Sequence, residues 1–220
     1  MRSTRRLMLA ATAMLAMSAT FTATSHAAGP GYTTLATPVP VAAQGKKVEV
    51  IEFFMYTCPH CYALDPLLEE WVKKQGDKIT FRRLHFAQSP TDPLAHAYVT
   101  LEAMGQTEAV HSKILRAIHG ERLRIYRSDD ELKQFLVKNG IDKARYEQLF
   151  NSFSVQTKMK QLGSLVTKYG VSSAPTLVVD GRYMTSPTIA GGAGTSETQA
   201  GRQTVAVLDQ LVAKAAAEKK

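Results

Sequence analysis

The sequence predicts an α/β domain into which a block of helices is inserted. Two β-rich runs, at residues 48–54 and 79–86, precede the block, and a β-hairpin pattern at 176–184 follows it. Residues 91–153, between them, show only helical spacing and helix caps. Because strands at the two ends of a chain need each other to form a sheet of useful width, we expect one sheet with the helices as an insertion.

The first strand leads directly into a helix that contains both cysteines. Residues 48–54 are nearly all apolar, which is typical of a strand buried on both faces, and Glu52 is the exception. Apolar residues then recur at helical spacing from about residue 59 to residue 74. Cys58 and Cys61 therefore fall in the first turn of this helix.

Caps divide the inserted block into four helices, and a longer amphipathic helix follows them. The residues expected to open the four helices are Asp92, Thr107, Ser128 and Asp142. Gly170 is expected to end the long helix. The expected core of the block is apolar and aromatic: Leu94, Tyr98, Leu101, Val110, Ile114, Leu132, Phe135, Leu136, Tyr146, Leu149 and Phe150.

A hairpin and a final helix complete the predicted domain. Asp180-Gly181 readily supplies the two positive φ angles of a type I′ turn. Residues 191–194 are expected to form a flexible loop, and the apolar spacing over 205–212 predicts the last helix. Residues 29–45 lack periodicity and are expected to be an extended arm. The predicted division is 1–27 for a leader, 28–90 for the first part of the α/β domain, 91–158 for the helical insertion and 159–220 for the second part.

The first 27 residues are typical of a cleaved secretory signal peptide. Three arginines and no acid precede an apolar run, and the small residues Ser25 and Ala27 favour cleavage after Ala27. An uncleaved membrane anchor is the alternative, but the apolar run falls short of the ~20 residues that span a bilayer. We therefore expect the mature chain in the periplasm of a bacterium, where thiols meet oxidising conditions.

Composition and charge exclude several classes of protein. The chain of 220 residues is 45% hydrophobic and 21% charged, which argues against intrinsic disorder. The formal net charge of +8 falls to +5 (24 basic minus 19 acidic residues) without the three leader arginines, and it indicates no nucleic-acid partner. Two cysteines are too few for a disulfide framework or for an all-cysteine zinc site.

The element Cys58-Pro59-His60-Cys61 predicts a redox-active dithiol. Unpaired N–H groups and the dipole at a helix N-terminus stabilise a thiolate, and His60 can add a positive charge nearby. Both effects are expected to lower the pKa of Cys58, while Cys61, one turn into the helix, is expected to be buried. A disulfide between the two would then be broken easily by attack on Cys58, which makes the pair a strong electron acceptor.

Two other roles are open to cysteines at this spacing. Half of a metal site is one, but no histidine stands at a ligand spacing from the pair, so we expect no metal. An inert structural disulfide is the other, but closing a loop of two residues gives little stability. A redox function therefore fits the pair best.

The segment from Glu52 to Tyr62, EFFMYTCPHCY, closely resembles the active-site segment of the DsbA family of periplasmic thiol:disulfide oxidoreductases. The resemblance extends from about Tyr32 to the C-terminal helix, although Thr57 replaces the more usual aromatic residue before the first cysteine. It implies a thioredoxin-like fold with a helical domain inserted into it, and no cofactor beyond the redox-active disulfide. The catalytic residues that it implies are Cys58, Pro59, His60 and Cys61.

The resemblance also implies a supporting loop and an apolar groove. Thioredoxin-fold proteins carry a cis-proline opposite the C-x-x-C element, here Ala174-Pro175, and the backbone beside it pairs with the substrate peptide. The alternative for Pro175 is simply the first position of a strand, but we favour the cis-proline because of its matched context. The candidates for the groove around the first cysteine are side chains that can also belong to the core: Met55, Tyr56, Tyr62 and Leu64.

Glu52 is expected to be a buried carboxyl group with a raised pKa, because it shares one face of its strand with apolar residues. Behind the buried Cys61, it can relay the proton that this thiol must lose, and the resemblance implies the same role. The alternative is a carboxylate neutralised by Arg82 or Arg83 with no catalytic role. The sequence leaves both interpretations open.

The resemblance implies a periplasmic dithiol oxidase that introduces disulfide bonds into newly exported proteins. Its implied partners are reduced or unfolded secreted proteins and an inner-membrane, quinone-coupled oxidase of the DsbB type, and we expect a monomer. A disulfide isomerase or a periplasmic dithiol reductant of the same fold is the alternative, although such isomerases carry an N-terminal dimerisation domain for which residues 28–45 are too few. A peptide-binding module with incidental thiols is a further alternative, in which blocking Cys58 leaves function intact.

Overall fold

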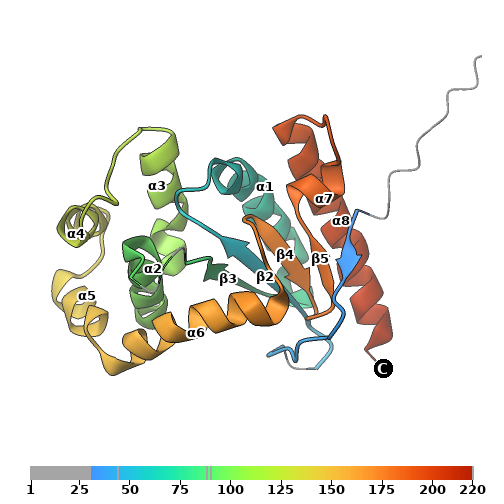
Figure 1. Cartoon of the computed structure of the whole chain (residues 1–220), viewed down its shortest axis with the longest axis horizontal. Helices are drawn as coiled ribbons and strands as arrows, with labels where there is room; N and C mark the ends of the chain where they lie inside the picture. Colours follow the sequence, from blue (N-terminus) through green and yellow to red (C-terminus); the bar gives the residue numbers. More distant parts are fainter. Residues whose placement is uncertain (1–30, 44, 88, 90, 220) are drawn as a thin grey trace, which may run out of the picture.

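Five strands form one mixed sheet in the computed structural model, which describes residues 31–43, 45–87, 89 and 91–219 (Figure 1). Their spatial order is β1 (Thr33–Thr34), β5 (Tyr183–Thr185), β4 (Thr176–Val179), β2 (Val48–Phe54) and β3 (Ile79–His85). β2 and β3 run parallel, and the other neighbours run antiparallel. β2 thus pairs with β4 from the far end of the chain, and the prediction of one sheet interrupted by helices is confirmed.

Parts of the predicted organisation lie outside the described residues. The leader over residues 1–27 and its cleavage after Ala27 are among them. In the part of the chain that the structure describes, no helix has the length and apolar character needed to cross a membrane. The division at residues 90 and 158 stays a prediction, and a single helix, α6 (Phe153–Tyr169), runs through the second of these positions.

Helix α1 (Pro59–Gln75) connects β2 to β3 through a short 3₁₀ turn (Gly76–Lys78). This strand–helix–strand unit fixes the parallel register, in which Glu52 of β2 lies directly beside Arg83 of β3. The helix begins as soon as β2 ends, so both cysteines are held at the carboxyl edge of a central strand.

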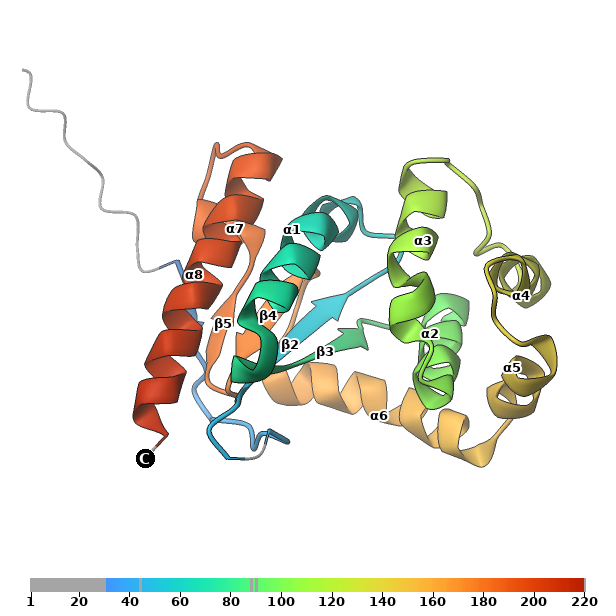
Figure 2. The ribbon, with the colours of Figure 1, turned by 180° about the vertical axis from the view of Figure 1, so that it is seen from behind.

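Different helices cover the two faces of the sheet. α1 and α8 (Glu197–Glu218) lie together on one face (Figure 2), where Val50 of β2 is fully buried. α6 covers the other face, where the ring of Tyr169 packs edge-on against Phe53 with 5.3 Å between the ring centroids. Alternate residues of β2 therefore enter two separate cores, which explains why the strand is apolar almost throughout.

The inserted block lies beside β3 (Figure 1). It consists of α2 (Pro93–Met104), α3 (Thr107–His119), α4 (Asp129–Lys138) and α5 (Lys143–Phe150). Of the residues predicted to form its core, all are buried except Phe135, Leu149 and Phe150, which are half-buried. The helical spacing therefore identified the inner faces of these helices.

Three of the four predicted caps of the block are confirmed. The side chains of Asp92, Ser128 and Asp142 accept backbone N–H groups in the first turns of α2, α4 and α5. The fourth prediction is wrong, because Thr107 is the first helical residue of α3 and Gln106 occupies the cap position without a side-chain bond. The Thr107 hydroxyl is buried without a hydrogen-bond partner, so it cannot satisfy the helix end.

Two segments are more regular than the sequence predicted. β1 forms within the expected arm and pairs with β5, but two residues are too few to give a periodic pattern. α7 (Pro187–Gly191) takes in the first glycine of the expected loop, and Ser186 caps it by accepting the N–H of Ile189 at 3.1 Å. The predicted turn is confirmed, since Asp180 and Gly181 have φ angles of 51° and 63°.

Candidate active site

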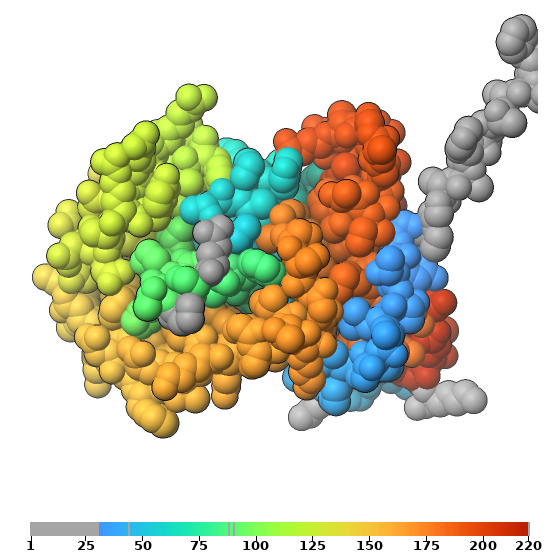
Figure 3. All heavy atoms as spheres, viewed as in Figure 1, coloured from blue at the N-terminus to red at the C-terminus, as the bar shows by residue number. Residues whose placement is uncertain are grey.

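Cys58 stands at the cap position of α1, held by backbone contacts on both sides. Its sulfur accepts the N–H of Cys61 at 3.4 Å, and its own N–H donates to the carbonyl of Met55 at 3.1 Å. Cys58 is 6% exposed and Cys61 is 1% exposed, and the two sulfurs are not bonded to each other. The segment that carries them reaches the surface between the helical block and the α7–α8 region (Figure 3).

The two thiols differ sharply in acidity. A hydrogen bond from Cys61 is the main cause that lowers the pKa of Cys58 to about 6, and it acts against the effect of burial. The backbone N–H groups of Cys61 and His60 and the charge of His60 lower this pKa further. The pKa of Cys61 is raised, because its thiol is hydrogen-bonded to Cys58, is buried and lies near Glu52. At neutral pH the site therefore holds one thiolate and one thiol.

The pH dependence of alkylation tests this difference. In the reduced protein, the rate of Cys58 modification by iodoacetamide is expected to reach half its maximum near pH 6, because the thiolate is the nucleophile. In Cys61→Ala the half-maximum is expected at a higher pH, because the main hydrogen bond to Cys58 is lost. Mass spectrometry of the Cys58 peptide after timed exposure measures both. A wild-type midpoint near that of an ordinary thiol, about pH 8.5, contradicts the assignment.

The loop before β4 lies directly against Cys58. The peptide bond between Ala174 and Pro175 is cis, as the resemblance implied. The Cys58 sulfur lies 3.3 Å from the Ala174 carbonyl oxygen, to which its protonated form can donate, and the Thr176 hydroxyl holds the loop by donating to the Ser173 carbonyl at 2.7 Å. The fold thus brings together residues that are 116 positions apart in the chain.

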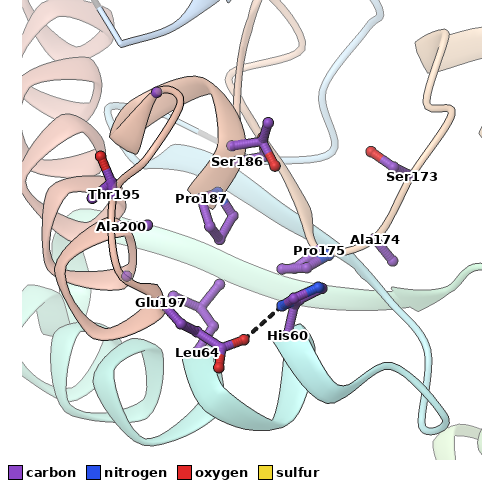
Figure 4. Close-up of a pocket in the computed structure, with 13 residues that line it drawn as sticks. His60, Leu64, Ser173, Ala174, Pro175, Ser186, Pro187, Thr195, Glu197 and Ala200 are labelled. Carbon is purple, nitrogen blue, oxygen red and sulfur yellow. Dashed lines mark hydrogen bonds and ion pairs between the residues drawn. The ribbon is translucent and has the colours of Figure 1, made fainter.

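His60 and Pro59 occupy the exposed side of the first turn of α1. The Nδ1 atom of His60 lies 2.5 Å from Oε1 of Glu197, in the first turn of α8 (Figure 4). Both side chains are more than half exposed. Glu197 belongs to no motif and lies 137 positions from His60, so nothing in the sequence identified it as part of the site.

Glu52 is buried beneath the thiols and meets one of the two candidate arginines. Arg83 donates from Nε to Oε2 of Glu52 at 3.0 Å, and both side chains are 2% exposed. Arg82 pairs with Glu49 instead. Burial raises the pKa of Glu52 even though the charge of Arg83 lowers it, so the prediction of a raised pKa is confirmed. The geometry contains both a high-pKa carboxyl near Cys61 and an arginine partner.

Arg83 also binds carboxylates that the sequence analysis did not single out. It donates to Glu69 at 2.9 Å and to Glu108 at 2.8 Å, and its Nη2 lies 3.7 Å from Oδ1 of Asp65. Burial acts to raise the pKa of Asp65, but its contacts, above all with His111 at 3.3 Å, lower it. Asp65 follows Cys61 by four residues on the buried side of α1. An acidic residue on the apolar face of a predicted helix could have identified it from the sequence.

The four groove candidates divide into two pairs. Tyr56 and Leu64 are 0% and 1% exposed and belong to the core, and Leu64 also lines a cavity at the site. Met55 and Tyr62 are half-buried beside the site, and the ring of Tyr62 stacks on His119 with 5.3 Å between the centroids. In the described part of the chain, no group of three or more His, Cys, Asp or Glu side chains is arranged to hold a metal ion.

A dithiol at the start of a helix, facing a cis-proline loop at the edge of this sheet, defines a thiol–disulfide exchange protein of thioredoxin-like fold. Comparison with protein families agrees, because the model of the DSBA-like thioredoxin domain matches residues 49–198. The chain belongs to this family and is a thiol:disulfide oxidoreductase.

Relatives and solved structures cover most of the chain. It is 36% identical over 193 residues to the thiol:disulfide interchange protein DsbA of Bordetella parapertussis, covering 87% of this chain and 91% of the relative. It is 39% identical over 162 residues to the DsbA of Burkholderia cepacia, covering 73% and 76%. The crystal structure of Pseudomonas aeruginosa DsbA matches with a TM-score of 0.74 and 35% identity, covering 86% of this chain and 95% of that one. The predicted fold class is confirmed.

Proposed function

We propose that this protein is a periplasmic dithiol oxidase that introduces disulfide bonds into newly exported proteins. The observation that carries the proposal is the difference between an acidic Cys58 at the helix cap and a buried Cys61 with a raised pKa. The stabilised Cys58 thiolate makes the reduced form of this pair more stable than the reduced form of an ordinary pair of thiols. Because the reduced form is stabilised, the disulfide is a stronger oxidant.

The proposed reaction has two exchange steps. A substrate thiolate attacks the Cys58 sulfur of the Cys58–Cys61 disulfide, the bond between the two cysteines breaks, and Cys61 leaves with the electron pair and takes up a proton. A second substrate thiolate then attacks the substrate sulfur of the mixed disulfide, and Cys58 leaves as a thiolate. The substrate has lost two electrons and gained a disulfide, and the two electrons are held by the reduced pair.

The other proposed roles follow from this scheme. His60 and Pro59 belong to the catalytic element, and Ala174 and Pro175 support the substrate chain beside it. Glu52 supports the buried thiol, either by relaying its proton or through its pairing with Arg83. Reduced or unfolded secreted proteins are the proposed substrates, and an inner-membrane, quinone-coupled oxidase of the DsbB type reoxidises the pair. We propose that the protein is exported by a cleaved signal peptide and acts as a monomer.

The lowered pKa of Cys58 gives the pair a specific pH dependence. A shift from 9.0 to about 6 stabilises the reduced form by on the order of 1 kcal/mol at pH 7, which corresponds to a few tens of millivolts for a two-electron couple. Because the pKa is lowered in the folded state, this stabilisation is complete above pH 9 and is lost as the pH falls through 6.

Equilibration with glutathione tests the proposed function. The reduction potential at pH 7 is expected to lie above that of thioredoxin, about −270 mV. It is expected to fall by about 59 mV per pH unit below pH 6, where reduction takes up two protons, and by about 30 mV per unit above pH 6, where it takes up one. The reduced fraction is measured by acid quenching, alkylation and mass spectrometry. A thioredoxin-like potential favours the reductant instead of the oxidase.

A further inference from the structure

A cavity of about 370 Å³ is lined by the loop that contacts the reactive sulfur. Its walls come from the start of α1, the loop before β4, α7 and the start of α8 (Figure 4). Ala174 and Pro175 line it, and the Ala174 carbonyl is 3.3 Å from the sulfur of Cys58. Consecutive residues of an extended chain are about 3.5 Å apart, so the neighbour of a cysteine bound to Cys58 can place its side chain in this cavity.

Glu197 gives the cavity its charge. Among the described residues that line it, Glu197 is the only acid, His60 is the only base, and none is a lysine or an arginine. The Glu197 side chain is 52% exposed, and one of its carboxylate oxygens contacts Nδ1 of His60 (Figure 4). A carboxylate offers about four acceptor sites, so this contact leaves most of its capacity free for another donor.

The rest of the lining combines apolar residues with hydroxyl groups, which suits a side chain that has an apolar stem and a polar head. Four hydroxyl groups line the cavity: Ser173, Ser186, Thr188 and Thr195. The hydroxyls of Ser186 and Thr195 already bind the backbone of α7, the first by capping it and the second by donating to Gly191. These two hydroxyl groups therefore hold the α7 wall of the cavity in place.

We propose that Glu197 is a specificity-determining residue, which makes this protein prefer substrates that carry lysine or arginine next to the reacting cysteine. The inference rests on the proposed function and adds a substrate class to it. A cationic side chain in the cavity donates to the free acceptor sites of Glu197, whereas an acidic side chain meets a like charge that, among the described lining residues, only His60 can offset. The excess positive charge of the whole chain acts on all substrates and does not depend on this residue.

The test compares three reduced dithiol peptides that are identical except for arginine, glutamine or glutamate after the first cysteine. Each is mixed with excess oxidised protein, and the second-order rate of peptide oxidation is measured by acid quenching and mass spectrometry at low and at high salt. Comparing each peptide between wild type and Glu197→Gln cancels the intrinsic reactivity of its thiol. At low salt the ratio of the arginine rate to the glutamate rate is expected to fall about two- to fivefold in the variant, and the difference shrinks at high salt.

Glu70→Gln is the matched control. Glu70 is an exposed residue of α1 outside the cavity, and its replacement removes the same charge. The arginine-to-glutamate ratio of this control is expected to equal that of the wild type. An unchanged ratio in Glu197→Gln overturns the inference, and so does an equal change in both variants. If wild type oxidises none of the three peptides, the proposed function fails instead, because that outcome does not depend on their charge.

Discussion

Cys58→Ser is expected to abolish the oxidation of reduced substrate proteins, with activity falling to the uncatalysed rate. Cys58 is the more acidic thiol and the better leaving group, and it is the sulfur that faces the Ala174 carbonyl and the surface. The formation of disulfides in a reduced, unfolded model protein, followed by loss of free thiols, measures the effect. Wild-type activity in this variant contradicts the mechanism and favours a peptide-binding module with incidental thiols.

Cys61→Ser supplies the complementary result. Its Cys58 thiolate exchanges with a protein disulfide to form a mixed disulfide, and no Cys61 thiolate is present to release the bound protein. Mixed disulfides are therefore expected to accumulate and to be visible on non-reducing gels. Cys61 is 1% exposed, so the reverse experiment with Cys58→Ser is expected to trap far less. Equal trapping by both variants contradicts the division of roles between the two thiols.

Arg83→Met is expected to lower the free energy of unfolding by about 3–5 kcal/mol, because it leaves the buried carboxyl groups of Glu52 and Asp65 without this cation. Guanidinium denaturation of the oxidised protein at pH 7 measures the loss. Arg116→Met is the control, since the Arg116 side chain is exposed and its ion pair with Glu121 is long, at 3.9 Å. Its effect is expected within about 0.5 kcal/mol.

Glu52→Gln in the Arg83→Met protein separates charge from packing. Glu52 is the most buried of the carboxylates that contact Arg83, so removing its charge is expected to restore part of the lost stability. The same logic predicts a smaller loss for Arg83→Met at acid pH, where the carboxyl groups are protonated. A double variant no more stable than Arg83→Met contradicts the view that the uncompensated charge of Glu52 is a main cost.

Local signals predicted most of the fold because each depends on a few neighbouring residues. Asp92 and Ser128 are caps whose partners lie two or three positions away, and the Asp180-Gly181 turn is set by its own φ angles. β1 was not predicted because it is defined by its pairing with β5, about 150 residues later, and not by a local sequence pattern. Thr107 had the right chemistry for a cap, but the packing of α3 buried its hydroxyl.

The site divides in the same way. Cys58 and Cys61 could be placed because strand, helix and thiols are continuous in the sequence. The choice of Arg83 over Arg82 needed the parallel register of β2 and β3, which no local pattern fixes. Glu197 is brought to the site by α8, the last helix of the chain, and only the tertiary structure reveals it.

Because of the order of the strands in the sheet, the active site around the two cysteines is incomplete until nearly the whole chain has been made. A nascent chain presents both cysteines early, yet Val50 of β2 pairs with Val179 of β4, and the carbonyl of Ala174 arrives with the same late segment. A chain released or cleaved after α6 retains both thiols but lacks this carbonyl, two strands of the sheet and the carboxylate that meets His60. The timing of synthesis thus separates the appearance of the thiols from the completion of their site.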